Sequence, residues 1–203
     1  MRLSQIESQN RYLLERQRQF RQAADVVTKV WMAFPEIEAI AVIGSVAKPL
    51  WKEVPRFSDF RRAGIEVWHE CGDLDLALWI DSQRRLSELR RATTHALRQA
   101  FEAGAGISFV SHQLDVFLFE PGTDRYLGRL CSFSQCPKGK EDCLVPGCGA
   151  IPFNKRIADF QPYADLLAPV IYSTLYRRGV GVLRFALELP SVDEADAAPV
   201  RRR

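Results

Sequence analysis

The sequence predicts an α/β (α+β) protein, in which strands and helices alternate along the chain. Three runs rich in β-branched residues and leucine, 37–43, 74–80 and 113–120, have the length and composition of buried strands. Two longer segments, about 5–33 and 82–101, repeat apolar residues every three or four positions, as amphipathic helices do. The chain has 203 residues, of which 47% are hydrophobic and 26% charged, so we expect a globular protein with a real core.

Charge and hydropathy exclude some classes of protein. The formal net charge is +3, and Arg201, Arg202 and Arg203 at the end of the sequence account for it. Proteins that neutralise many phosphates usually have a stronger basic footprint, so a nucleic acid partner is possible but not favoured. No run approaches the ~18 apolar residues of a membrane span, and the first residues are too polar for a secretory signal. We therefore expect no membrane association and a cytoplasmic location, where cysteines stay reduced.

The first predicted region is an N-terminal helical segment, residues 1–34. Ser4 and Glu7 have the spacing of a capping box, and Pro35 ends the helix. The arginines between Arg2 and Arg21 are interpreted as a solvated helix face.

The second predicted region, residues 35–120, forms the core of the domain. Gly44-Ser45 closes the first strand, and the residues after it are expected to begin a short helix that Pro49 cuts. Residues 53–71 have no clear pattern, and Asp81 is the expected cap of the helix that follows the second strand.

The remaining sequence predicts a cysteine-rich loop and a C-terminal extension over 121–190, packed on the core. Residues 169–177 alternate as a strand does, and R-G-V-G is a plausible turn into the second arm of a β-hairpin, although a helix for that arm stays open. Residues 191–203 have few bulky apolar side chains and are expected to be disordered.

Three aspartates stand in otherwise apolar strands. Side chains alternate along a strand, so Asp73 and Asp75 project from one face, opposite the leucines between and after them. Asp115 has the same setting in the third strand, and the three carboxylates meet if these strands are neighbours. Clustered carboxylates repel one another, and Mg²⁺, which prefers oxygen ligands, relieves the repulsion. Such a site suits phosphoryl or nucleotidyl transfer.

A phosphate-binding element would complete such a site. Gly44 lets the backbone approach a phosphate, and the Ser45 hydroxyl and neighbouring N–H groups can donate to phosphate oxygens. Lys48, Arg61 and Arg62 are further phosphate-binding candidates.

Gly44-Ser45, then Asp73-Leu74-Asp75, then Asp115 on a later strand resembles the DNA polymerase beta-like nucleotidyltransferase superfamily. The nearest type is the small, minimal nucleotidyltransferases, a group with aminoglycoside-modifying relatives. The resemblance covers residues 37–120 and implies a mixed β-sheet flanked by helices. It also implies that Gly44 and Ser45 bind nucleotide phosphates, that Asp73 and Asp75 hold two Mg²⁺ ions, and that Asp115 shares one metal and helps activate an acceptor hydroxyl.

The expected activity is therefore enzymatic: Mg²⁺-dependent transfer of a nucleoside monophosphate from a nucleoside triphosphate, ATP or another, to an acceptor hydroxyl, with release of pyrophosphate. The alternative is a non-catalytic nucleotide-binding regulatory or toxin–antitoxin-type protein. Residues 46–72 depart from the family, because the gap between Ser45 and Asp73 is about twice the usual one. We interpret this insertion as a loop over the site. The sequence determines neither the acceptor, the base preference nor the oligomeric state.

Four of the five cysteines lie together, at Cys131, Cys136, Cys143 and Cys148, in the pattern C-x4-C-x6-C-x4-C. Four thiolates separated by Pro and Gly turns suit a structural Zn²⁺ ion, which can supply folding energy to a polar loop. Free cysteines, a disulfide pair and an iron–sulfur cluster are the alternatives. Cys71 is interpreted as a small buried residue.

Overall fold

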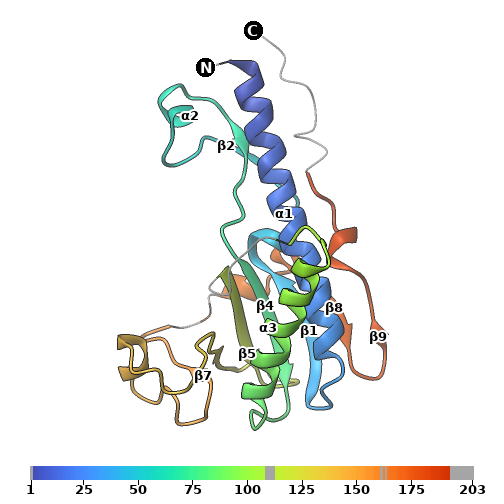
Figure 1. Ribbon diagram of the computed structural model, residues 1–203, viewed down its shortest axis with the longest axis vertical. Coiled ribbons are helices and arrows are strands. Elements are labelled where there is room, and N and C mark those ends of the chain that lie inside the picture. The colour runs from blue at the N-terminus through green and yellow to red at the C-terminus, as the bar shows by residue number, and fades with distance from the viewer. Residues whose placement is uncertain (1, 108–112, 161, 163, 193–203) are drawn as a thin grey trace.

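A mixed seven-stranded β-sheet forms the centre of the computed structural model, which describes residues 2–107, 113–160, 162 and 164–192 (Figure 1). The strand order is β7-β6-β5-β4-β1-β8-β9. β4 and β5 are parallel, and the other neighbouring strands are antiparallel. The strands are β1 (Ile37–Ile43), β4 (Leu74–Ile80), β5 (Leu114–Phe119), β6 (Tyr126–Leu130), β7 (Asn154–Lys155), β8 (Tyr172–Arg177) and β9 (Gly181–Val182). The predicted mixed α/β architecture and its three central strands are thus confirmed.

Two helices, α1 (Leu3–Trp31) and α3 (Leu86–Glu102), lie side by side on one face of the sheet (Figure 1). The Trp31 indole donates a hydrogen bond of 2.7 Å to Thr93 Oγ1 and links the two helices. The leucines of β4 point to this face and are fully buried, as their alternation predicts. Since α3 connects two neighbouring parallel strands, β4-α3-β5 is a β-α-β unit.

The opposite face of the sheet carries a second apolar cluster and, at one end, the predicted carboxylates. Ala41, Ala77 and Phe117 lie in this cluster, next to partly buried side chains that include Phe160 and Tyr172. Small side chains on β1 and β4 therefore make room for the residues between β7 and β8 to cover part of this face.

The N-terminal helix differs from its prediction in two details. It begins at Leu3, and the Arg2 backbone N–H donates to Gln5 Oε1 at 2.8 Å, so the predicted capping box of Ser4 and Glu7 is wrong. Arg21 is fully buried rather than solvated, which corrects the interpretation of this helix face for that residue.

The segment between Gly44 and Asp73 forms an arm beside the N-terminal half of α1 (Figure 1). A 3₁₀ turn, Gly44–Ala47, replaces the expected short helix and ends before Pro49. The arm then contains β2 (Lys52–Glu53), α2 (Asp59–Arg62) and β3 (Val67–Trp68), with β2 and β3 paired. The Trp68 N–H donates to Asn10 Oδ1 at 2.9 Å. The arm therefore packs on α1, and the predicted loop over the carboxylates is wrong for this segment.

The C-terminal region contains the predicted hairpin with a shorter second arm. β8 pairs with β9, and a 3₁₀ turn, Ala186–Glu188, follows. Short 3₁₀ turns also occur at Glu141–Leu144, Ala164–Leu167 and Pro169–Ile171. The prediction of disorder is wrong for Ser191 and Val192, because the Leu50 N–H donates to the Ser191 carbonyl at 2.9 Å and Leu50 bridges to Val192. The rest of that tail lies outside the described residues.

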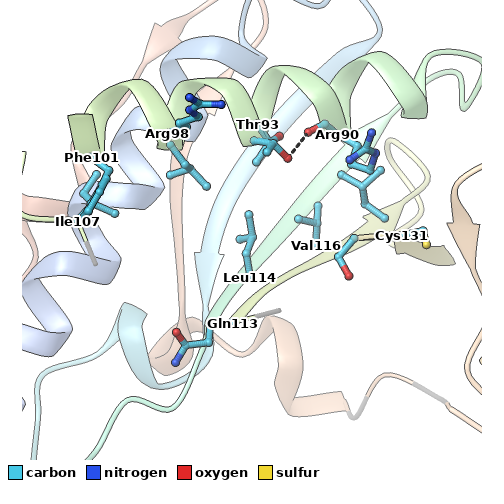
Figure 2. A pocket seen from close by; sticks show the side chains of 13 residues that line it. Arg90, Thr93, Arg98, Phe101, Ile107, Gln113, Leu114, Val116 and Cys131 are labelled. Carbon is cyan, nitrogen blue, oxygen red and sulfur yellow. Dashed lines mark hydrogen bonds between the residues drawn. The ribbon is translucent and has the colours of Figure 1, made fainter. Parts of the chain in front are cut away.

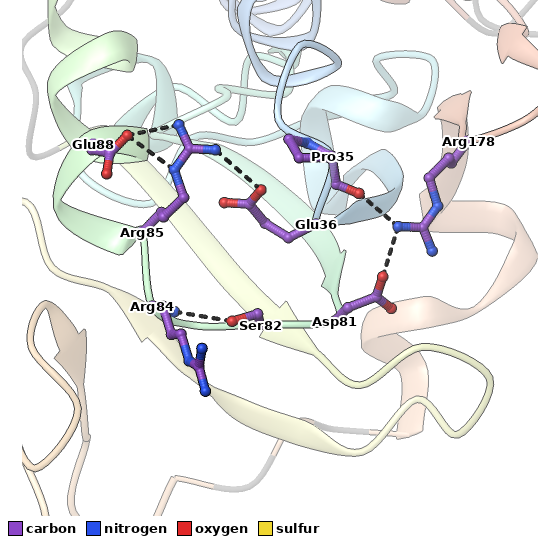
Figure 3. A network of polar contacts seen from close by, with 8 residues as sticks. All are labelled: Pro35, Glu36, Asp81, Ser82, Arg84, Arg85, Glu88 and Arg178. Carbon is purple, nitrogen blue, oxygen red and sulfur yellow. Dashed lines mark hydrogen bonds and ion pairs between the residues drawn. The ribbon is translucent and has the colours of Figure 1, made fainter.

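A network of ion pairs joins the end of the sheet where β1 begins and β4 ends (Figure 3). Arg178 contacts the Asp81 carboxylate at 2.6 Å and Glu38 at 2.7 Å, and it donates to the Pro35 carbonyl. Asp81 is thus a partner of Arg178 and not the predicted helix cap, because α3 begins only at Leu86. None of the described helices is both long and apolar enough to span a bilayer.

Candidate functional site

The three predicted carboxylates come together at the end of the sheet where β1 ends and β4 and β5 begin. Ile43 pairs with Asp75, and Asp75 pairs with Asp115, so these residues form one row across β1, β4 and β5. Asp73 lies just before β4 on the same side and is exposed. Each carboxylate offers an oxygen within 4.8 Å of the oxygens of the other two. The parallel register of β4 and β5 therefore produces the cluster that the sequence predicted.

Burial and charge disfavour the ionised form of Asp75. Loss of hydration and then the negative charge of Asp73 raise the pKa of Asp75 to about 7, against the opposing effect of the Arg129 guanidinium. In the absence of a cation this carboxyl group is therefore ready to take up a proton near neutral pH. A divalent cation would favour the ionised form, so the set of oxygen donors fits a hard metal ion such as Mg²⁺.

Arg129 on β6 is a site residue that the sequence did not predict. Its guanidinium forms an ion pair with Asp115, and it lies over the ring of Phe117 at 5.6 Å from the centroid. Burial lowers the pKa of Arg129, while the charges of Asp75 and Asp73 raise it. The run Y-L-G-R-L is short and contains a glycine, so its only signal was one arginine among apolar residues.

Gly44 approaches the carboxylate cluster more closely than any residue with a side chain could. Its φ angle is +72°, and a Cβ atom at this position would lie 2.9 Å from Asp75 Oδ2. Any other residue would be strained and would displace the carboxylate. The Ser45 hydroxyl contacts the thiol of Cys71, which is fully buried as predicted. The Gly44-Ser45 turn therefore lies directly against the cluster.

Arg21 holds the chain just after this turn. Its guanidinium donates to the carbonyls of Val46 at 3.0 Å and Lys48 at 3.1 Å. It also donates to the carbonyls of Leu189 at 2.6 Å and Pro190 at 3.0 Å. Burial lowers the pKa of Arg21 to about 10, so the side chain stays charged at neutral pH. A buried arginine with four carbonyl partners is a strong positioning element for the turn.

The other predicted phosphate-binding residues are not brought to the site. Lys48 Nζ lies over the ring of Trp51, 3.9 Å from its centroid. Arg61 and Arg62 belong to α2 in the arm, and Arg62 forms an ion pair with Asp59 at 2.6 Å. Their predicted role receives no support from this arrangement.

The four clustered cysteines are free thiols in the segment between β6 and β7. Among the described residues, the three aspartates form the one group of three or more metal-binding side chains whose ligand atoms all lie within 4.8 Å of one another. The sulfur atoms of Cys131, Cys136, Cys143 and Cys148 are thus more widely spaced than a preformed tetrahedral site requires.

An apolar cavity of about 500 Å³ lies between α3 and strands β5 and β6 (Figure 2). Leu97 of α3 and Leu114 and Val116 of β5 line the cavity, with Arg90 and Arg98 among the polar residues. Because Asp115 alternates with Leu114 and Val116, the carboxylates lie on the other face of the sheet. The cavity contributes no group to the carboxylate cluster.

Comparisons of the chain with protein-family models, with curated proteins and with solved structures give no match.

Proposed function

We propose that the protein is a nucleotidyltransferase of the DNA polymerase beta-like superfamily, of the minimal type. It would transfer a nucleoside monophosphate from a nucleoside triphosphate to an acceptor hydroxyl and release pyrophosphate. The observation that carries the proposal is the meeting of the Asp73, Asp75 and Asp115 oxygens within 4.8 Å, beside a glycine turn.

Charge supports a metal-dependent reaction at this cluster. Among the described residues, Arg129 is the arginine whose charge acts on the three carboxylates, and burial makes the ionised form of Asp75 costly. Bound Mg²⁺ ions would neutralise charge on the reacting phosphate and polarise it. Asp73 and Asp75 are the residues that would hold both ions, and Asp115 would share one.

The remaining groups position the substrates. The acceptor oxygen attacks the α-phosphorus, the bond between that phosphorus and the bridging oxygen of pyrophosphate breaks, and Asp115 takes the acceptor proton. The close approach of Gly44 to Asp75 supports a role of the Gly44-Ser45 turn in binding the phosphates that leave, for which its backbone N–H groups would be the donors. Once cations balance Asp115, Arg129 is free to donate to a phosphate oxygen.

A second function, nucleotide binding without catalysis, is favoured by one observation. The Arg129 guanidinium already pairs with Asp115, the residue that an active enzyme needs for the acceptor. If this pair persists with nucleotide bound, Asp115 cannot take the acceptor proton. The protein would then be a nucleotide-binding regulator.

The two functions differ in pyrophosphate release. Labelled nucleoside triphosphates, Mg²⁺ and a panel of hydroxyl acceptors are incubated with the wild type and with Asp115→Ala. Nucleotidyl transfer predicts a labelled product and pyrophosphate with the wild type and neither with the variant. Nucleotide binding without pyrophosphate from any acceptor would favour the regulator, and absence of Mg²⁺-dependent nucleotide binding would overturn both.

A further inference from the structure

The segment from Ser132 to Phe153 has no apolar core of its own. No residue in this segment is buried, and Leu144 is 80% exposed. Its cysteines are among its less exposed residues: Cys136, Cys143 and Cys148 are half-buried, and Cys131 at its start is buried. An ordered segment of this length needs another source of stability, because ordering each residue costs about 1–2 kcal/mol of conformational entropy.

Tight turns hold the backbone at two of the cysteines. The Cys143 N–H donates to the Lys140 carbonyl at 2.8 Å, and the Cys148 N–H donates to the Val145 carbonyl at 2.9 Å. Gly149, with a φ angle of +76°, lies so close to Cys136 that a Cβ atom would be 3.4 Å from its sulfur. The other three thiols lie near enough to Cys131 for their charges to act on it, although the four sulfur atoms are more widely spaced than in a formed tetrahedral site.

Two of the sulfur atoms accept hydrogen bonds from the backbone. The N–H groups of Lys138, Gly139 and Lys140 point at Cys143, and that of Phe133 points at Cys131. These donors lower the pKa of the Cys143 thiol, whereas burial raises the pKa of the Cys131 thiol in spite of its donor. The described cysteines are all free, so disulfides do not use these sulfur atoms.

We propose that the thiols of Cys131, Cys136, Cys143 and Cys148 bind one structural Zn²⁺ ion. Thiolates are soft ligands and prefer Zn²⁺ to Mg²⁺, so this site and the aspartate cluster select different metals. Zinc binding brings the sulfur atoms into a tetrahedral arrangement around the ion. The segment can adjust to this arrangement, because it has no packed core of its own. The inference does not depend on the proposed nucleotidyl transfer.

The proposal is tested first on the unmodified protein. Elemental analysis after purification in a reducing buffer should find about one zinc ion per chain. After chelation, titration with Co²⁺ should give the charge-transfer absorption of thiolate-bound cobalt, saturating at about one equivalent. Wild-type protein that neither retains zinc nor shows this absorption overturns the proposal.

Variants locate the metal. Each of three single substitutions should weaken zinc binding by more than about 100-fold: Cys136→Ser, Cys143→Ser and Cys148→Ser. Cys71→Ser, which removes the cysteine outside the cluster, should keep the full zinc content. Equal zinc loss in Cys71→Ser, or loss in Asp75→Asn with retention in the cysteine variants, would contradict the assignment.

Chelation supplies a readout that needs no variant. Zinc removal should expose residues 132–153 to protease at least about 10-fold faster, while the sheet stays folded by circular dichroism. Unchanged cleavage of this segment after complete zinc removal would show that the metal does not order it.

Discussion

Acidic residues lie at both ends of the β1–β4 strand pair, but the two ends differ in how far positive charges neutralise them. At the end where β1 begins, each acidic residue of the network has an arginine partner, and most of these side chains are exposed. That network consists of Glu36, Glu38, Asp81 and Glu88 with Arg85 and Arg178, and Figure 3 shows all of these residues except Glu38. At the end where β1 finishes, the described part of the chain offers the three aspartates one arginine, Arg129, and Asp75 and Asp115 are partly buried.

This difference in charge neutralisation distinguishes a cluster that stabilises the fold from one that can bind a ligand. Paired surface carboxylates connect loops and need no further partner. Partly buried carboxylates with too few cations are unstable as ions, and binding a metal or a proton relieves them. The comparison therefore supports the proposal that the end with Asp73, Asp75 and Asp115 binds the metal and the substrates.

The largest expected effect comes from exchanging one carboxylate at each end. Asp75→Asn should lower nucleotidyl transfer by about 1,000-fold or more, because it removes a metal ligand. Asp81→Asn, at the other end of β4, should leave the rate within about twofold. Steady-state rates of pyrophosphate release measure both effects. An equal loss of rate in the two variants would contradict the functional difference between the two ends of the strands.

The second effect is on stability and follows from the raised pKa of Asp75. A pKa of about 7, above the ordinary 3.8, favours the protonated carboxyl in the folded protein. This contribution is present below pH ~4 and is lost as the pH rises through ~7. Without divalent cations, raising the pH from about 5 to about 8.5 should destabilise the wild type by ~2 kcal/mol relative to Asp75→Asn.

Urea unfolding at both pH values measures this difference. Mg²⁺ at the higher pH should stabilise the wild type and have little effect on Asp75→Asn. Parallel pH dependence in the two proteins would mean that Asp75 ionises normally.

A smaller effect is expected at Arg129, with opposite signs for two ligands. Arg129→Met should weaken nucleoside triphosphate binding by about 10-fold, because it removes a phosphate partner. The same variant should tighten Mg²⁺ binding without nucleotide by roughly threefold, because a competing positive charge is gone. Calorimetric titrations of each ligand measure both, and weaker binding of both would indicate a structural role only.

The smallest effect is expected at Arg178, in the balanced network. Arg178→Met should lower the midpoint of thermal unfolding by about 2–4 °C and leave nucleotide and Mg²⁺ binding unchanged. Scanning calorimetry is the measurement. A change in ligand binding would show that the two ends of the strands are coupled.

The sequence was sufficient to predict the carboxylate cluster, because local pattern determines it. Alternation places Asp75 and Asp115 opposite buried leucine and valine, and burial of those residues orients both aspartates. The three central strands are long and apolar, so their positions were clear as well.

Features that depend on distant partners could not be predicted in this way. Asp81 looked like a helix cap, but Arg178, 97 residues later, binds its carboxylate. Arg21 looked solvated, since nothing in a helix pattern reveals carbonyl partners as far as 169 residues away. Arg129 lies on β6, a short strand next to the edge strand, and the pairing of β6 depends on its neighbours in the sheet.

The Arg21 contacts connect the proposed phosphate-binding turn to a remote part of the chain. One guanidinium joins the carbonyls of Val46 and Lys48 to those of Leu189 and Pro190. The conformation of residues 189–190 therefore influences the turn beside Asp75, although neither residue is near it in sequence. A binding partner or a proteolytic cut at that segment would act on the site from outside, through the loss of carbonyl partners for a single buried cation.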